Sequence, residues 1–324
     1  MVRHINTRRL LYGGKNRFGV LNSWIFFGVL FFLLILLYQR DATSADIFVT
    51  PPPRPRIFCV IVTYAFRHEH AAIHIQKTWA RHCDRYVFVS DDVHILLEPA
   101  VFRNIRDKWQ RIRAHLEYIY KYHFHQGDWF LYANDDNFVV VENLRHMLQS
   151  YSSEELIYFG CKMRSKGRSQ ALVYMYDGSG IVLSSASLKR FVLEALINED
   201  LCSSHSKGSE AAKELGRCLS NVNVIAGDSR DEFKKHRFLP FEVDIHLGGQ
   251  MNDSVELHKY FLEHSYHPVI DMNLPVSLKS ICFHLMLIPI TYDLYYFTQN
   301  VHIFGASQKW DLENLELEIK NFYN

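Results

Sequence analysis

Residues 128–145 read DWFLYANDDNFVVVENLR, and this stretch decides the fold. Its first apolar run, residues 129–131, predicts a buried strand that ends at Ala133. Four polar residues, 134–137, follow at once, and a second apolar run then leads into a segment with helical spacing. Carboxylates placed where a parallel strand ends lie at the edge of an α/β sheet where ligands usually bind.

The two carboxylates of this polar run, Asp135 and Asp136, have two explanations. Hard oxygen ligands suit Mg²⁺ or Mn²⁺, and phosphate oxygens commonly complete the coordination of such a metal. The run is therefore a candidate metal-diphosphate site. Asn and Asp are also ordinary turn-forming residues, so a polar turn between two buried strands explains the same sequence. The local residues leave both interpretations open.

The composition is that of a folded protein with one large domain. The chain has 324 residues, of which 14% are aromatic and 22% charged, so it can bury a sizeable core. A formal net charge of +1 gives no indication of nucleic-acid binding, and we expect none.

The N-terminal region predicts a membrane anchor. Residues 20–38 are nearly all apolar, and about 20 such residues suffice to span a bilayer as a helix. Basic residues in the preceding segment, 1–19, leave that segment cytosolic by the positive-inside rule. Residues 39–56 contain PPPRPR and predict an extended stem, which leaves 57–324 as a luminal domain. A cleaved signal peptide is the alternative.

Strands and helices alternate along most of the luminal domain. The apolar runs predict strands at 56–64, 86–90, 129–131, 156–160 and 174–184. Helical spacing predicts helices at 69–82, 107–123, 186–201 and 210–219, and a terminal amphipathic helix at 311–322. This alternation predicts an α/β fold with a mostly parallel central sheet and helices on both faces. An N-glycosylation sequon begins at Asn252.

The order of several motifs resembles one enzyme family. TWARHCDRYVFVS, DWFLYANDDNFVVVENLR, YFGCKM, YMYDGSGIVLS, LGRCLSNVNVIAGDSRDE and CFH follow one another along the chain. The chain thereby resembles the core 1 β1,3-galactosyltransferases, over roughly residues 57–305. The resemblance implies a GT-A fold behind a type II anchor in the Golgi membrane. It also implies an inverting, Mn²⁺-dependent transfer of galactose from UDP-galactose to O-linked N-acetylgalactosamine on glycoproteins.

The resemblance also implies a set of metal ligands. The family pattern Ala-Asp-Asp-Asp-Thr corresponds here to residues 133–137, ANDDN, so that Asp136 falls at the metal-binding aspartate with Asp135 beside it. The family's second ligand, the histidine of a Ser-Phe-His segment, corresponds to His284. Taken alone, a histidine in this sequence would more often be a hydrogen-bonded core residue.

Five further residues are expected near the donor by the same resemblance. Thr78 and Trp79 correspond to the segment that seats the nucleotide, and Gly178 and Gly180 to a glycine-rich stretch beside donor and acceptor. Arg111 falls where the family carries a basic residue near the diphosphate. On local grounds the two glycines also fit a simple turn, and Arg111 also fits a solvated helix face.

The general base is the main departure from the family. Inverting transfer needs a carboxylate to take the proton of the acceptor hydroxyl. The family places Glu-Asp just before Leu-Gly-Arg-Cys, and the ungapped match falls on Ala211 and Ala212, whose methyl groups cannot accept a proton. Glu210 and Glu214 flank this position but point in other directions on a helix. The catalytic base is therefore left unassigned.

The acceptor side departs as well, because Tyr260 and Leu262 stand where the family has tryptophans. Two hypotheses follow: a galactosyltransferase with weakened or shifted activity, or an inactive paralogue that acts as a chaperone or binding partner of an active relative. A homodimer or a complex with a related transferase is expected in either case.

The six cysteines permit disulfide bonds if the domain is luminal. The resemblance favours a bond between Cys202 and Cys218, and Cys59 with Cys83 is a second candidate. Alternatively, all six are small buried apolar residues.

Overall fold

The computed structural model describes residues 28–33, 35, 54–165, 171–206, 210–247, 255–268, 276–284 and 287–301. The chain divides into two units, Met1–Pro53 and Arg54–Asn324, and each is considered by itself. Within the described ranges no helix has the length and apolar character needed to cross a bilayer. Most of the predicted span and stem, the sequon at Asn252 and the predicted helix at 311–322 lie outside these ranges.

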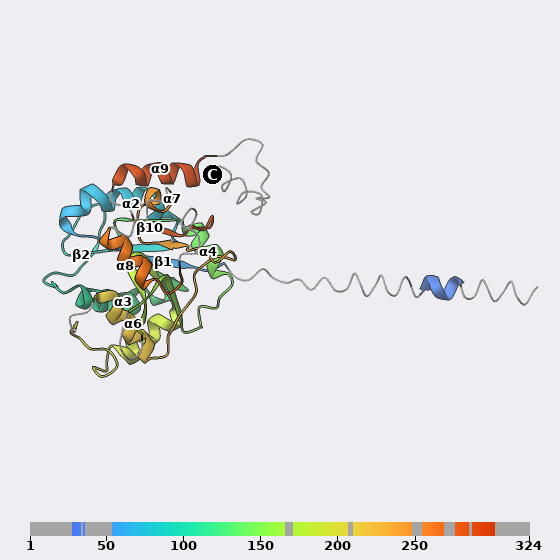
Figure 1. The fold of residues 1–324 in the computed structure, drawn as a ribbon, viewed down its shortest axis with the longest axis horizontal. Helices are drawn as coiled ribbons and strands as arrows, with labels where there is room; N and C mark the ends of the chain where they lie inside the picture. Colours follow the sequence, from blue (N-terminus) through green and yellow to red (C-terminus); the bar gives the residue numbers. More distant parts are fainter. Residues whose placement is uncertain are drawn as a thin grey trace, which may run out of the picture. The chain divides into compact units, whose positions relative to one another are not determined.

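A seven-stranded sheet forms the centre of the second unit (Figure 1). Its strands are β1 (Ile57–Val62), β2 (Arg85–Ser90), β3 (Ala100–Val101), β4 (Trp129–Asn134), β6 (Ile157–Arg164), β7 (Val173–Ser184) and β8 (Ile225–Ala226). Their spatial order is β3-β2-β1-β4-β7-β6-β8. Neighbouring strands are parallel except at β7, which runs antiparallel to both β4 and β6. The expectation of an α/β fold with a mostly parallel sheet is confirmed.

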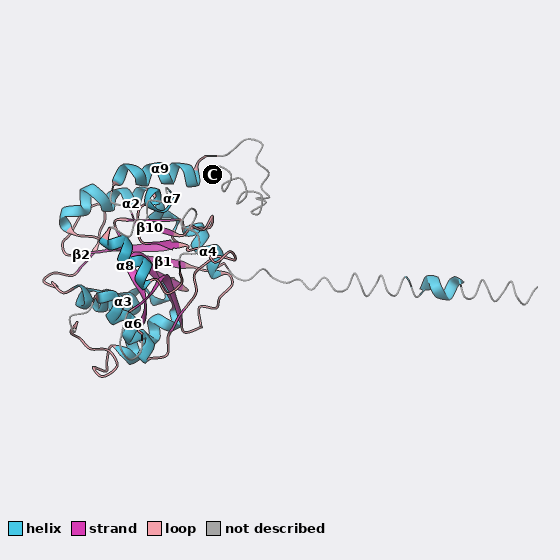
Figure 2. Cartoon of the chain, viewed as in Figure 1, coloured by secondary structure: helices cyan, strands magenta, loops and turns pink. Residues whose placement is uncertain are grey.

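Helices cover both faces of this sheet, as Figure 2 shows. They are α2 (Ile73–Lys77), α3 (Lys108–His123), α4 (Val141–Leu148), α5 (Ser185–Arg190), α6 (Ala211–Asn221), α7 (Val243–Leu247), α8 (Glu256–His264) and α9 (Ile288–Gln299). Alternate side chains of β1 enter different cores: Phe58 packs with α3 and α6, whereas Cys59 packs with α2 and α4. All six residues of β1 are therefore buried, as in a parallel strand covered on both faces.

A second, three-stranded sheet stands beside the first. It consists of β5 (Asn137–Val139), β10 (Cys282–His284) and β9 (Phe238–Leu239), in the order β5-β10-β9. The antiparallel pairing of β5 with β10 places His284 opposite Asn137. This pairing brings the C-terminal CFH motif to the polar turn after β4, although His284 and Asn137 are 147 positions apart in the sequence.

Two predicted helices are broken in the structure. The segment predicted as one helix at 69–82 is a π-helix (His68–Ala72), α2 and a 3₁₀ helix (Trp79–His82), interrupted at Thr78 with φ −111° and ψ −113°. The helix predicted at 186–201 ends early, because α5 passes into a π-helix at Phe191–Ala195. The break at Thr78 lets the Trp79 side chain turn into the core, beneath the site described below.

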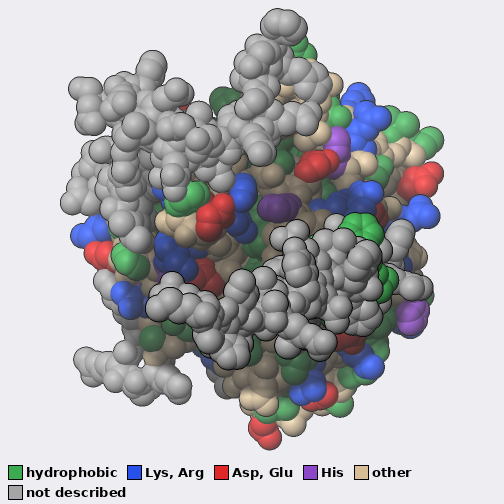
Figure 3. Space-filling model, turned by 90° about the vertical axis from the view of Figure 1, so that its right-hand side faces the viewer, with side chains coloured by type: hydrophobic (Ala, Val, Ile, Leu, Met, Phe, Trp, Pro, Cys, Tyr) green, Lys and Arg blue, Asp and Glu red, His purple; other side chains and the backbone are tan. Residues whose placement is uncertain are grey.

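Both expected disulfide bonds are present, Cys59–Cys83 and Cys202–Cys218. The first ties β1 to the segment before β2, and the second ties the segment after the π-helix to α6. Cys161 and Cys282 are free and buried. On the face drawn in Figure 3, Lys and Arg side chains are mixed with Asp and Glu side chains.

Candidate functional site

The polar turn after β4 is held by its two asparagines. The Asn137 side chain accepts the backbone N–H of Asn134 at 2.8 Å and donates to the carbonyl of Gly178. The side chain of Asn134 donates to the carbonyl of Asp177 at 3.3 Å. The turn is therefore fastened to β7, and its geometry is set by amide groups rather than by the carboxylates.

Asp135 points into the protein and is fully engaged. One carboxylate oxygen accepts the Thr63 hydroxyl at 2.7 Å, and the other accepts Nε of Arg67 at 2.7 Å. Burial raises the pKa of Asp135 to about 6, although both of these partners favour the charged form. Asp135 was a candidate for the metal-diphosphate site, and the structure shows it joining the turn to the segment that follows β1.

Asp136 and His284 face each other across the two sheets. Oδ1 of Asp136 lies 3.8 Å from Nδ1 of His284. Each of these two atoms is buried and has no hydrogen-bond partner among the described residues. Burial raises the pKa of Asp136, and the nearby His284 opposes that rise. The two atoms are close enough to contact one shared ion. A metal ion bound between them would satisfy both.

This pair fits a divalent metal only if other ligands complete the shell. Carboxylate oxygen and imidazole nitrogen together suit Mn²⁺, and diphosphate oxygens commonly supply remaining positions. Within the described part of the chain, no cluster of three or more His, Cys, Asp or Glu side chains could hold a metal by itself. The arrangement therefore suits a metal that arrives with a nucleotide rather than a closed structural site.

Thr78 and Trp79 lie beneath the turn rather than at its surface. The Trp79 ring is buried, and its Nε1 donates to the carbonyl of Asn137 at 2.9 Å. The Thr78 hydroxyl donates to the carbonyl of His74 at 2.8 Å and is buried as well. Trp79 therefore supports the turn from below, whereas the Thr78 side chain bonds within the segment that precedes it.

Besides Arg67, two basic residues of α3 lie near the turn. Lys108, which the sequence analysis did not select, forms an ion pair with Asp177 at 2.7 Å and also favours the charged form of Asp136. Arg111 lies one turn further along, with its guanidinium 5.2 Å from the centre of the Tyr64 ring. Both are on the side of the sheet where the turn emerges, and Lys108 is the nearer of the two to the carboxylates.

The glycines of β7 permit close packing beside the turn. A side chain at Gly178 would meet the Tyr176 ring at 2.5 Å. Gly180 has φ +76°, in the left-handed region that L side chains rarely adopt, and it lies beside Cys282 of β10. Gly180 thus lets β7 pass close to the CFH motif, and Gly178 leaves room for the Tyr176 ring.

A pocket of about 390 Å³ lies where α3, β7 and the start of α6 meet. Lys108, Tyr176, Asp177 and Glu210 line it. Burial raises the pKa of Tyr176, and the charges of Asp177, Asp136 and Glu210 add to the rise, so the pocket lies within electrostatic range of Asp136.

Of the four residues around the expected base position, only Glu210 faces this pocket with a carboxylate. Ala212 is 2% exposed and belongs to the apolar core, and Ala211 is also buried. Glu214 is 2% exposed and is paired with Arg217. Glu210 is half exposed, 3.0 Å from Nζ of Lys213. The structure therefore distinguishes Glu210, which faces the pocket, from Glu214, which is buried, although both flank the expected base position.

The region expected to bind the acceptor has an aromatic and hydroxyl lining. The Tyr260 hydroxyl lies 3.1 Å from that of Tyr174 and 3.4 Å from Oε1 of Glu210. The Tyr260 ring is stacked on His264, with ring centres 4.1 Å apart. Leu262 packs against the apolar core. Tyr260 is thus tied to the same carboxylate that faces the pocket.

Comparisons with known proteins agree with this geometry. The sequence profile of the family described as Fringe-like matches residues 54–236. The chain is 31% identical over 277 residues to glycoprotein-N-acetylgalactosamine 3-beta-galactosyltransferase 1 of Xenopus laevis, covering 82% of this chain and 74% of that protein. It is 23% identical over 178 residues to the beta-1,3-glucosyltransferase of Mus musculus, covering 54% of this chain and 35% of that protein.

Among solved structures, mannose-1-phosphate geranyltransferase from Thermus thermophilus matches with a TM-score of 0.29 and 11% identity. That match covers 53% of this chain and 69% of the other, and a score this low carries no argument. The profile and the Xenopus relative together cover most of the folded unit. The chain belongs to the Fringe-like family, as a divergent glycosyltransferase related to the core 1 β1,3-galactosyltransferases.

Proposed function

We propose that this chain transfers galactose from UDP-galactose, in β1,3 linkage, to O-linked N-acetylgalactosamine on glycoproteins of the Golgi lumen. The observation that carries the proposal is the pair formed by Asp136 and His284, whose facing atoms are buried and unsatisfied. Mn²⁺ bound there with the donor would neutralise the charge that develops on the leaving diphosphate. The related Xenopus protein, named for the same transfer, supports the choice of sugars.

Glu210 is the base in this proposal. The acceptor hydroxyl oxygen forms a bond to the anomeric carbon while the bond from that carbon to the diphosphate oxygen breaks. The acceptor proton passes to the Glu210 carboxylate, which lines the pocket beside Tyr176 and Asp177. Lys213 and Tyr260 contact the same carboxylate and hold it toward the pocket. Glu214 cannot serve, because it is buried and paired with Arg217.

Matched variants test both assignments. The purified chain, UDP-galactose, Mn²⁺ and a glycopeptide carrying N-acetylgalactosamine should give product above background. Glu210→Gln should lower the rate by about 10²–10⁴-fold, as loss of a general base does. Glu214→Gln, the control on the same helix, should lower stability with little direct effect on the chemical step. An equal loss of rate in the two variants would contradict the assignment.

The metal pair has its own test, which does not depend on turnover. UDP with Mn²⁺ should raise the thermal midpoint of the wild-type chain, since a ligand at 100 times its Kd stabilises by about 2.7 kcal/mol. Asp136→Asn should abolish this shift while the unliganded protein stays folded. A Mn²⁺-dependent shift that survives in Asp136→Asn would refute the metal site.

The runner-up function is an inactive partner of an active galactosyltransferase. It is favoured by one observation, the burial of Ala211 and Ala212 where the family carries its carboxylates. Co-expression with an active relative should then raise the yield of that relative, and the two should co-purify. Absence of turnover with a panel of donors and acceptors, together with such a gain, would replace the first proposal by the second.

A further inference from the structure

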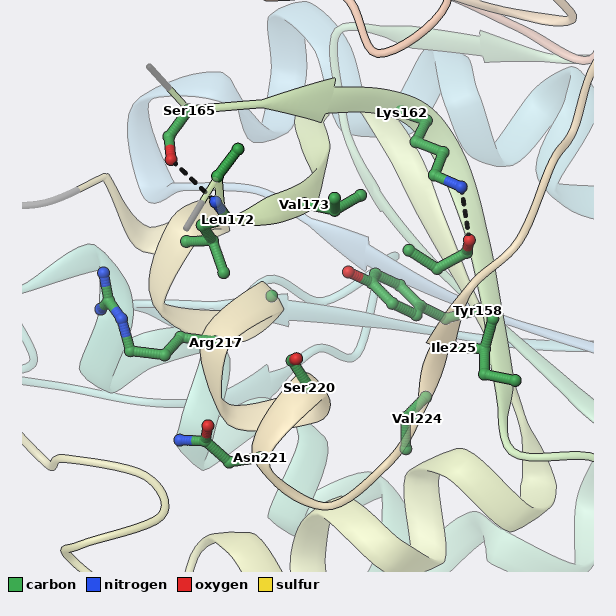
Figure 4. A pocket seen from close by; sticks show the side chains of 13 residues that line it. Tyr158, Lys162, Ser165, Leu172, Val173, Arg217, Ser220, Asn221, Val224 and Ile225 are labelled. Carbon is green, nitrogen blue, oxygen red and sulfur yellow. Dashed lines mark hydrogen bonds between the residues drawn. The ribbon is translucent and has the colours of Figure 1, made fainter. Parts of the chain in front are cut away.

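A second pocket lies away from the metal pair. It has a volume of about 610 Å³ and is enclosed by β6, β7, the segment around β8 and the C-terminal half of α6 (Figure 4). This volume is within the range of about 300–1,000 Å³ that is usual for small-molecule sites. Glu210 precedes the first residue of α6, whereas Ser220 near its last turn lines this pocket. The two pockets therefore belong to opposite ends of one helix.

The bottom of the pocket contains an unsatisfied polar group. Tyr158 lines the pocket, is 1% exposed, and its hydroxyl has no hydrogen-bond partner among the described residues. Figure 4 shows its ring pointing into the space between Val173 and α6. A buried hydroxyl without a partner costs about 1–3 kcal/mol, so its retention is unusual unless something bonds to it. A ligand hydroxyl in the pocket would satisfy it.

The walls combine apolar surface with neutral polar groups. Leu172, Val173 and Ile225 supply apolar side chains, and Ser220 and Asn221 supply hydroxyl and amide groups from α6. A sugar ring presents C–H faces to apolar walls and hydroxyls that both donate and accept. This mixture of lining groups matches that chemistry.

The two cations of the pocket already have partners. Nζ of Lys162 donates to the carbonyl of Ala226 at 2.7 Å and lies 4.2 Å from the centre of the Tyr266 ring. Arg217 is paired with the buried carboxylate of Glu214. Burial also raises the pKa of Tyr158, which keeps its hydroxyl neutral. Because neither cation is left to pair with a bound anion, a neutral ligand fits this pocket better than an anionic one.

The pocket is preformed by close packing of its walls. A side chain at Gly216 of α6 would lie 2.6 Å from Cβ of Tyr174, so the helix approaches β7 as closely as a glycine allows. The Cys202–Cys218 bond fixes the same helix from its other side. The α6 wall is thus already in place, which lowers the cost of ordering it around a small ligand.

We propose that this pocket binds a neutral sugar unit, at a site separate from the one that holds donor and acceptor. The Tyr158 hydroxyl bonds to a sugar hydroxyl, and Ser220 and Asn221 contact the sugar from α6. The inference goes beyond the proposed transfer reaction and does not depend on it, because it requires binding and no turnover.

Saturation-transfer NMR on the full-length chain tests the proposal, with methyl α-galactoside and methyl N-acetyl-α-galactosaminide as probes. At least one should give a signal in the wild type and also in Asp136→Asn. Ser220→Trp, a change at an exposed helix position that fills the pocket, should remove the signal. Tyr158→Phe should weaken binding by about threefold to tenfold while the thermal midpoint stays the same or rises. Weaker sugar binding at an unchanged or higher thermal midpoint would show that the Tyr158 hydroxyl acts in binding rather than in stabilising the fold.

Three results would overturn the inference. The first is no signal from either sugar in the wild type. The second is a signal that persists in Ser220→Trp but disappears in Asp136→Asn, which would place the sugar in the catalytic site. The third is binding of N-acetylneuraminic acid or inorganic phosphate alone, which would show an anion site. A failed transferase assay with retained sugar binding would refute the proposed function and leave this inference standing.

Discussion

At the scale of single residues, two adjacent carboxylates have different fates. Asp135 is satisfied by Thr63 and Arg67, which precede it by 72 and 68 residues. Asp136 turns outward to His284 and keeps an oxygen without a partner. The residues alone predicted only that one or both could bind a metal, because the partners that decide between them are remote in sequence. The family resemblance paired Asp136 with His284, and the structure places their facing atoms 3.8 Å apart.

Several residues of the site were missed by sequence reasoning. Lys108 and Asp177 form an ion pair at the pocket, and Asn137 fastens the turn to β7. Asn137 stood within the motif, but an amide in a polar turn gives no signal of which groups it will bond. Lys108 lies at the start of a predicted helix, and only the fold shows that the N-terminal end of this helix lies near the turn.

Ala212 gives a prediction at this scale. Ala212→Asp restores the carboxylate that the family carries, yet the residue lies in the apolar core. We expect no gain of activity and a loss of at least about 2 kcal/mol in the free energy of unfolding, because a polar group would be buried without a partner. Denaturant unfolding and the galactosyl-transfer assay measure the two effects.

Ala212→Asn is the matched control, since it has the same size and does not titrate. The difference in stability between the two variants should shrink as the pH falls and the new carboxyl group becomes protonated. New transfer activity in Ala212→Asp, with unchanged stability, would show instead that this position opens onto the pocket.

At the scale of elements, long periodic segments were predicted well and short ones were not. The five longer strands of the large sheet and the helices α3 and α6 follow from their apolar patterns, whereas the helices predicted at 69–82 and 186–201 are broken. The sheet of β5, β10 and β9 has strands of two or three residues, too short for a period to be seen. Their pairing depends on contacts between distant segments. His284, one residue of the metal pair, therefore lies on a strand that sequence patterns do not reveal.

The turn between β4 and β5 gives the second prediction. Asn137 is fully buried, and its side chain joins Asn134 to Gly178. Asn137→Ala should lower the free energy of unfolding by about 2–4 kcal/mol, because a backbone N–H and a carbonyl lose their partners. It should also weaken the Mn²⁺-dependent thermal shift with UDP, since Asp136 belongs to the same turn. Chemical unfolding and thermal shift give the two values.

Asn134→Ala is the comparison for that variant. Its side chain makes one longer bond, 3.3 Å to the carbonyl of Asp177, and is only half-buried. We expect it to cost about 1 kcal/mol or less. Equal costs for the two variants would mean that the turn is not held mainly by Asn137.

At the scale of the whole molecule, three buried histidines make the fold sensitive to acid. Burial lowers the pKa of His115 to about 3, that of His246 to about 3 and that of His236 to about 4. Nε2 of His246 accepts the backbone N–H of Phe241 at 3.2 Å, so its protonation would also remove an acceptor. The fold therefore requires these rings to be neutral.

The sign of the pH dependence follows from these values. Each histidine titrates near 6.5 when exposed in the unfolded chain, so its contribution to stability is present above that pH and is lost as the pH falls toward 4. Asp135 opposes them: burial raises its pKa to about 6, so its contribution is lost as the pH rises from 3.8 to 6. Between pH 4 and 6 these four groups together bind about two more protons in the unfolded chain than in the folded one. Through these groups the free energy of unfolding should fall by about 3 kcal/mol per pH unit on acidification.

Denaturant unfolding at several pH values between 4 and 7 measures this slope. His115→Gln should reduce it by about one proton, because the substitute does not titrate and its amide can still bond to the Tyr132 hydroxyl, which lies 2.9 Å from Nδ1 of His115. His125→Gln, at an exposed histidine, should leave the slope unchanged. A stability that stays level between pH 6.5 and 4 would mean that the buried rings find partners for their protonated forms. A slope of the expected size would show that the fold, and with it the metal pair, requires the buried histidines to be neutral.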